Sequence, residues 1–249
     1  MKPAIFLFLM LVVSAAPCAA GTPGIDLGWN SCSTAAANSD MEFTCDTNDR
    51  GTPFTLVMAF RPPVDIPDMA GVSMVIDFCT GPLTLPNWWM FGPGQCRAGS
   101  FLFPASAAGV GNTCANVWAG HTSGGGFSFT AGFGGKWNSA RIVMDYGISD
   151  GVGATAGTRY LAGVATIDQL HTVDAGPGDP ACTGCSYPAC FVLNSVEVFG
   201  FAPNEDYLIE SADTRQYVMW QGGAVGGVGC PFIVATRTST WGAIKAMYR

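Results

Sequence analysis

The residues best suited to chemistry cluster in the segment "ACTGCSYPACFVLN", where Cys182, Cys185 and Cys190 lie within nine residues of one another. Such a cluster could bind a metal, form a redox-active pair or close disulfide bonds. A structural zinc site usually takes its thiolates as two close pairs, whereas the fourth cysteine, Cys230, lies 40 residues downstream. A redox C-x-x-C motif places its first cysteine at a helix N-terminus, but Pro188 stops a helix here. We therefore predict that all four cysteines form disulfide bonds.

The other cysteines lie in two loop segments and one apolar segment. Cys32 with Cys45, and Cys96 with Cys114, would each close a loop rich in Gly, Ala, Ser and Asn. Closing loops of this length stabilises a fold by roughly 3 kcal/mol, so we predict these two pairs. Cys79 follows the strand-like run "VSMVIDF" and is predicted to be a buried free thiol.

A serine-hydrolase pattern occurs once, in "GISDG", with Ser149 in the nucleophile position and His171 downstream as a candidate base. That motif needs a strand, a sharp turn and a helix, whereas "GVGATAG" follows this one. We assign no catalytic residue. The second histidine, His121, lies in a glycine-rich loop, where it is a candidate ligand contact. Two histidines are too few for a three-histidine metal site.

One segment carries oxygen ligands suited to calcium. In "DTNDR", Asp46, Asn48 and Asp49 could coordinate the ion. The EF-hand glutamate is missing, because Val57 occupies the twelfth position. The alternatives are a loop-type calcium site and an Asx turn. No other cofactor is predicted.

A glycosidase would need two carboxylates facing each other across a cleft. The chain has 18 acidic residues, and the sequence does not show which of them lie close together. Asp77 and Glu197 fall inside apolar strand-like runs, so each needs a partner if it is buried.

Two adjacent tryptophans, Trp88 and Trp89, are the best candidates for a binding surface. Pro86 precedes them in "LPNWWMF", which favours an extended segment. Neighbouring residues of a strand point to opposite faces. We therefore expect one ring in the core and the other outside it, either as an exposed platform for a sugar ring or under a covering loop.

The segments that position these residues have the sequence pattern of β-strands. Apolar residues recur with a period of two and each run ends at turn-forming residues; the runs are 25–29, 54–60, 72–78, 127–133, 140–146, 160–168, 191–199 and 215–220. At least eight strands without a long helix between them predict an all-β fold, an antiparallel β-sandwich of jelly-roll-like form. A short C-terminal helix is predicted within 237–249.

The first 20 residues have the pattern of a secretory signal peptide: Lys2, an apolar core and a small-residue "CAA" end. The chain from 21 to 249 is then one disulfide-bonded domain, secreted to an extracellular or periplasmic place. No later segment is long and apolar enough to span a membrane. Without Lys2, 10 basic residues accompany 18 acidic ones. Because no basic cluster occurs, nucleic acid is a poor partner.

Five stretches together resemble an uncharacterised family of secreted bacterial proteins: "GIDLGWN", "LPNWW", "CTGCSYPACFVLN", "WQGG" and "TWGAIKAMYR". The resemblance implies a bacterial origin and secretion, and it implies no activity. We expect a non-catalytic binding or surface-associated protein whose partner is a polysaccharide or a cell-surface component. The alternatives are a secreted hydrolase of glycosidase type and a self-assembling extracellular subunit. The oligomeric state is open.

Overall fold

The structure is a computed structural model that describes residues 22–32, 38–103, 114–121, 123–201 and 206–222. The predicted signal peptide at 1–20 and the predicted helix at 237–249 lie outside these residues. The described part is built from strands and two short 3-10 helices, η2 (Asn87–Trp89) and η3 (Phe133–Gly135). It contains no helix that could cross a membrane.

The strands form two sheets. The smaller has four strands in the order β1 (Gly24–Trp29), β3 (Phe54–Arg61), β8 (Tyr160–Ile167) and β5 (Phe101–Leu102), and each neighbouring pair is antiparallel.

The larger sheet has seven strands. Its main path runs β2 (Asp40–Met41), β11 (Tyr217–Trp220), β9 (Ala189–Gly200), β4 (Ile66–Thr80), β7 (Ser139–Ala154) and β6 (Ser123–Ala131), and β10 (Tyr207–Ile209) pairs with β9. The short β2 runs parallel to β11, and the other described pairs are antiparallel.

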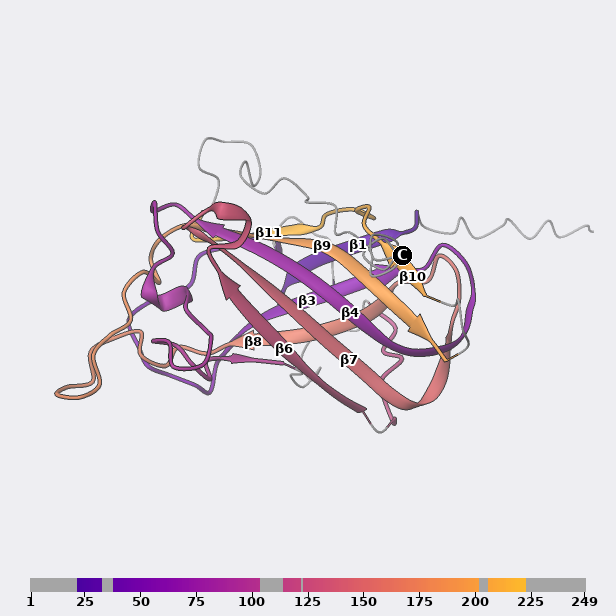
Figure 1. The fold of residues 1–249 in the computed structure, drawn as a ribbon, viewed down its shortest axis with the longest axis horizontal. Helices are drawn as coiled ribbons and strands as arrows, with labels where there is room; N and C mark the ends of the chain where they lie inside the picture. The colour runs from indigo at the N-terminus through magenta and orange to yellow at the C-terminus, as the bar shows by residue number, and fades with distance from the viewer. Residues whose placement is uncertain (1–21, 33–37, 104–113, 122, 202–205, 223–249) are drawn as a thin grey trace, which may run out of the picture.

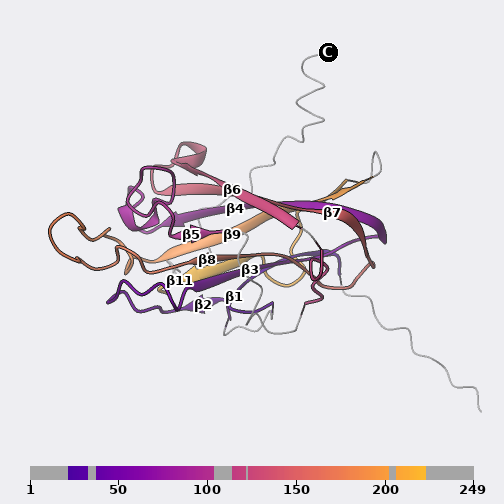
Figure 2. The ribbon, with the colours of Figure 1, turned by 90° about the horizontal axis from the view of Figure 1, so that it is seen from below.

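The two sheets form two layers with the main core between them (Figures 1 and 2). On β4 every second residue from Val72 to Phe78 is buried there, as the period-two pattern requires. On β3 the residues of both faces are largely buried. The centre of the core is aromatic: Trp29, Trp89 and Phe191 contact Trp220 or one another with ring centroids 5.1–5.9 Å apart.

The all-β prediction is confirmed. Every one of the eight predicted runs contains a strand, and the two longest, β4 and β7, extend well beyond the apolar runs that identified them. The short strands β2, β5 and β10 were not predicted. They have two or three residues each, which is too few for a period-two pattern to appear.

The prediction for the tryptophan pair is wrong. Trp88 and Trp89 lie in η2 rather than in a strand, and both side chains have 0% exposure. Successive residues of a 3-10 helix are about 120° apart instead of opposite, so both rings reach the core. The Trp88 indole donates a hydrogen bond to Thr172 Oγ1 at 2.9 Å. Neither ring can serve as an exposed platform.

The predicted local cysteine pairs are also wrong. The bonds are Cys32–Cys114, Cys45–Cys185 and Cys96–Cys182, with sequence separations of 82, 140 and 86 residues. Cys190 is disulfide-bonded too, whereas Cys230 lies outside the described residues. Cys79 is a buried free thiol, as predicted. These disulfides indicate an oxidising, extracytoplasmic environment.

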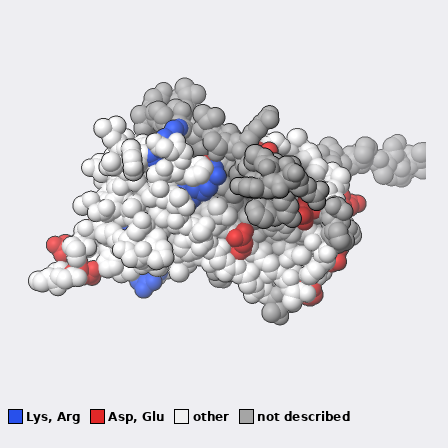
Figure 3. Space-filling model, in the orientation of Figure 1, with Lys and Arg blue, Asp and Glu red and all other residues white. Residues whose placement is uncertain are grey.

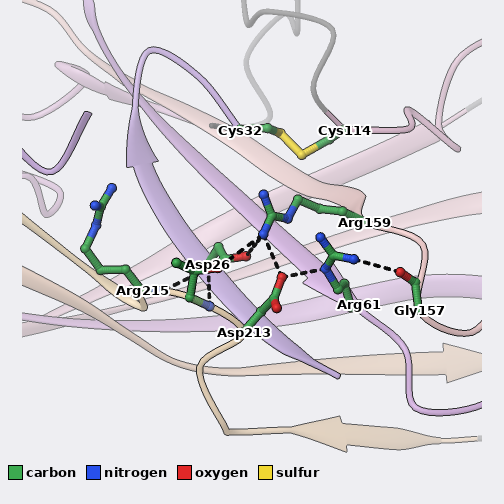
Figure 4. A network of polar contacts seen from close by, with 9 residues as sticks. Asp26, Cys32, Arg61, Cys114, Gly157, Arg159, Asp213 and Arg215 are labelled. Atoms are coloured by element: carbon green, nitrogen blue, oxygen red, sulfur yellow. Dashed lines mark hydrogen bonds and ion pairs between the residues drawn. A yellow bond between two sulfur atoms is a disulfide. The ribbon is translucent and has the colours of Figure 1, made fainter. Parts of the chain in front are cut away.

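A charged network joins β1 and β3 to the segment between β10 and β11 (Figure 4). Asp213 accepts hydrogen bonds from Arg61 Nε at 2.5 Å and from Arg159 Nη2 at 2.6 Å. Arg159 also lies 3.0 Å from Asp26, whose other oxygen accepts two backbone N–H groups. Asp26 and Asp213 are less than a tenth exposed, so the network links elements that are distant in sequence.

Candidate functional site

A groove of about 420 Å³ lies on the outer face of the larger sheet, where β6 begins and β9 ends. It spans parts of four neighbouring strands, β6, β7, β4 and β9. Half of its lining residues are glycines: Gly71, Gly124, Gly125, Gly126 and Gly147. Strand interiors are normally poor in glycine, because the residue has no side chain to pack there. Because so many glycines are unusual inside strands, we take this groove as the candidate binding site.

Two of the glycines leave the floor of the groove bare. Gly124 pairs with Gly147 and Gly126 pairs with Asp145 across β6 and β7, on the face that points away from the core. A Cβ atom added at Gly124 or Gly126 would meet no atom within 4 Å. The absence of a side chain at these two positions therefore opens space to solvent. Packing would tolerate a larger residue at either position.

Packing requires two of the other three glycines, Gly71 and Gly125. A Cβ atom at Gly71 would lie 2.5 Å from the Tyr146 carbonyl oxygen, and one at Gly125 would lie 2.4 Å from the Asp145 carbonyl oxygen. Gly71 also adjoins a β-bulge, since Gly71 pairs with Gly147 while Met69 pairs with Val152. Bulges bend and twist a strand locally, and this one shapes the end of the groove.

Two carboxylates lie beside the groove floor at one register position. Ser73 of β4 pairs with Asp145 of β7 on one side and with Glu197 of β9 on the other. Two strand spacings separate Asp145 and Glu197, which is roughly 10 Å between backbones. Burial raises the pKa of Glu197, and repulsion by Asp206 raises it further.

An aromatic residue forms the wall on the β9 side. Phe199 lines the groove and pairs with Gly71. Phe201 follows two residues later and is 50% exposed. The groove thus combines a bare backbone floor, a carboxylate and an aromatic edge.

The "GISDG" segment forms the bulge of β7 at the groove end. Ser149 donates a hydrogen bond to Asp150 at 3.2 Å, and His121 Nδ1 lies 2.9 Å from the same carboxylate. The hydrogen bond from His121 lowers the pKa of Asp150. Because Ser149 lies within a continuing strand, the nucleophile geometry of a serine hydrolase is not formed. His171 pairs with Asp179 instead.

The opposite end of the β6–β7 hairpin carries the exposed tryptophan of the described chain. Trp137 is 79% exposed and follows η3. Its carbonyl accepts a hydrogen bond from the Leu85 amide at 2.8 Å, close to Leu83, which is 92% exposed. Between Trp137 and the groove, Arg141 and Asp77 form a two-point ion pair at 2.6 and 2.7 Å. Asp77 therefore has the partner that its buried position requires.

Charges are unevenly distributed over the face shown in Figure 3. In this view the basic side chains lie in the left half, with some acidic ones at the left tip, and the coloured side chains to the right are acidic. The right side is where β6 begins and β9 ends (Figure 1). The groove therefore lies in an acidic part of the surface.

Two of the three predicted calcium ligands, Asn48 and Asp49, form hydrogen bonds within the protein. Asn48 exchanges two hydrogen bonds of 2.9 Å with the Val173 backbone. Asp49 accepts hydrogen bonds from the Gly51 amide and the Thr52 hydroxyl, and these bonds lower the pKa of Asp49. This is the Asx turn that was the alternative. Within the described residues no three His, Cys, Asp or Glu side chains, Asp46 included, group as metal ligands.

Comparison with protein-family models, with curated proteins and with solved structures gives no match. The site is therefore defined by its geometry. Sequence reasoning did not identify the groove, although it did identify His121 near its end. The available signal was the run "SGGGFSF", in which three glycines open a strand.

Proposed function

We propose that this chain is an exported β-sandwich protein, jelly-roll-like in form, that binds a polysaccharide on the outer face of its larger sheet. The glycine-lined groove is the observation that carries the proposal. Glycan chains present flat apolar ring faces and many hydroxyl groups. A bare strand floor allows close approach, Asp145 offers acceptor oxygens for hydroxyl groups, and Phe199 offers an apolar edge.

Trp137 would supply a second aromatic contact beyond the groove. It lies at the other end of the β6–β7 hairpin, and nine strand residues, Ser123 to Ala131, separate the two ends. At about 3.3 Å per residue this is roughly 30 Å. Such a distance suits an extended chain of several sugars better than a single monosaccharide.

The charge of the face favours neutral or amino-sugar chains. Asp145 lines the groove, and Glu197 and Asp206 are close enough to each other for repulsion to raise the pKa of Glu197. A uronate or sulfated polymer would add negative charge at this place, which costs binding energy.

The experiment is a calorimetric titration with neutral, amino-sugar and uronate oligosaccharides. We expect binding of the first or second class and at least a tenfold loss of affinity in Gly126→Leu, because its side chain would fill the groove. Ser128→Leu is the matched control: Ser128 lies on the same face of β6, outside the groove. Equal affinity of both variants and the unchanged protein would contradict the proposal.

A second candidate function is hydrolysis of the bound glycan. It is favoured by the position of Asp145 and Glu197 on either side of Ser73 and by the raised pKa of Glu197. Two carboxyl groups on either side of a substrate, one of them with a raised pKa, are the arrangement that glycosidases use. Product release from an oligosaccharide, lost in Glu197→Gln while binding persists, would establish this activity. Binding without turnover would reject it.

A further inference from the structure

Two cysteines face each other across neighbouring strands of the larger sheet. Cys79 of β4 and Cys190 of β9 are register partners, and their exposures are only 5% and 2%. Directly opposed residues of antiparallel strands have Cα atoms about 4.5–5.5 Å apart. Disulfides span Cα distances of about 4.4–6.8 Å, so a bond between these two cysteines is within reach at this register.

The two sulfur atoms are in different oxidation states. Cys79 is a free thiol, whereas Cys190 is already half of a disulfide. A thiol beside a disulfide is the reactant pair of thiol–disulfide exchange, in which a thiolate attacks one sulfur and displaces the other. Strand pairing holds this reactant pair together in the folded chain.

We propose that Cys79 and Cys190 form a thiol–disulfide exchange site that gives the folded protein two alternative disulfide states. The Cys79 thiol first loses its proton to solvent. Its sulfur then forms a bond to Cys190 Sγ, and the existing disulfide of Cys190 breaks. The displaced sulfur leaves with the electron pair and takes up a proton, so one thiol and one disulfide are present before and after, and no oxidant or reductant is consumed.

The surroundings keep this exchange slow at rest. Cys79, Cys190 and Val192 form a small apolar cluster, against which Tyr217 and Met219 pack. Burial raises the pKa of the Cys79 thiol, and the nearby positive charge of Lys136 offsets part of that effect. Since only the thiolate attacks, the first disulfide state persists until the thiol ionises.

Exchange would have a defined structural result. The new bond would join β4 directly to β9, the two strands at the centre of the larger sheet. The thiol would move from Cys79 to the cysteine released from Cys190. The site thus converts one structural disulfide into another without unfolding the sheet.

The test is disulfide mapping of the intact oxidised protein held in a glutathione redox buffer at mildly alkaline pH. Samples are acid-quenched, alkylated and digested without reduction. We expect a Cys79–Cys190 peptide pair to accumulate, with an unchanged number of thiols per chain. The Cys32–Cys114, Cys45–Cys185 and Cys96–Cys182 bonds should stay intact and serve as the internal control for folding.

The variant Cys79→Ser supplies the second arm. In this variant the disulfide of Cys190 should stay intact throughout the incubation, as the three reference disulfides do. Rearrangement at Cys190 at the same rate in Cys79→Ser would overturn the proposal. So would a Cys79–Cys190 pair that is absent, or that forms only together with scrambling of the reference bonds. Because the unchanged protein carries the main readout, a poorly folding variant does not remove the test.

Discussion

The guanidinium carbon of Arg97 lies 4.0 Å from the ring centroid of Trp88, and neither side chain is exposed. A cation over the face of an indole is attracted by the ring quadrupole. Burial lowers the pKa of Arg97 to about 10, and Asp168 acts in the opposite direction. Arg97 therefore stays charged at neutral pH, inside the aromatic core next to η2.

Asp168 should matter more for stability than its exposed partner does. It lies 3.6 Å from Arg97 and 2.8 Å from Arg50. In Asp168→Ala the buried cation loses its compensating charge, so we expect the free energy of unfolding to fall by about 3–5 kcal/mol. Arg50→Ala, the control, should cost less than about 1 kcal/mol, because Arg50 is 57% exposed. Urea denaturation measures both, and equal effects would contradict this account.

Each long-range disulfide should contribute strongly to stability. The chain-entropy relation gives about 4.5–5 kcal/mol for loops as long as those closed by Cys45–Cys185 and Cys32–Cys114, and measured values are commonly about 2–4 kcal/mol. We therefore expect the double variants Cys45→Ala/Cys185→Ala and Cys32→Ala/Cys114→Ala to lose similar amounts, at least about 2 kcal/mol each. Thermal unfolding at one protein concentration compares them. A loss in only one of the two would indicate that native-state contacts dominate.

These disulfides also show where sequence reasoning ends. The strands could be predicted because burial of one face imposes a local period of two. Cys45 bonds Cys185, 140 residues away, because two loops meet at one end of the folded chain, and no local pattern contains that information. Likewise, Pro86 restricts its own neighbourhood but does not decide between a strand and the 3-10 turn that buries both Trp88 and Trp89.

The groove was missed for a related reason. The sequence of Gly124, Gly125 and Gly126 is equally typical of a loop and of a weak strand. These glycines form a groove only because they pair with the strand that contains Asp145 and Gly147. Strand partners follow from the topology, which no local pattern contains. The apolar run singles out Glu197, but its position two strands from Asp145 follows only from the strand register.

Adjacent glycines of β6 should respond oppositely to alanine. Gly124→Ala adds a Cβ atom into open space at a backbone φ that is not positive, so we expect stabilisation by about 0.4–1 kcal/mol through the unfolded state. Gly125→Ala places its Cβ atom 2.4 Å from the Asp145 carbonyl, and we expect a loss of at least about 1 kcal/mol. The midpoint of chemical unfolding separates the two. Destabilisation by both would show that the groove floor is needed for the fold.

The network in Figure 4 should make the stability of the fold depend on pH. Burial alone would raise the pKa of Asp213, but the hydrogen bonds from Arg159 and Arg61 outweigh it, so the pKa lies below 3.8. A depressed pKa stabilises the fold above the unfolded-state value, and this contribution is lost as the pH falls through the folded value. Asp213→Asn should therefore cost about 3 kcal/mol at pH 7, and its cost should shrink below about pH 4.

Asp26 is the control within the same network, because its pKa is shifted in the opposite direction to that of Asp213. Burial raises its pKa above 3.8, against the hydrogen bonds from the Arg215 and Thr214 backbone. A raised carboxyl pKa means that the stabilising contribution of the protonated form is present at low pH and is lost as the pH rises through the folded value. Asp26→Asn should thus cost less at pH 7 than at pH 3, the reverse of Asp213→Asn. Urea unfolding of both variants and the unchanged protein from pH 3 to pH 7 measures the difference. If the losses of unfolding free energy in Asp26→Asn and Asp213→Asn changed in the same direction with pH, the opposite pKa shifts of these two carboxyl groups would be contradicted.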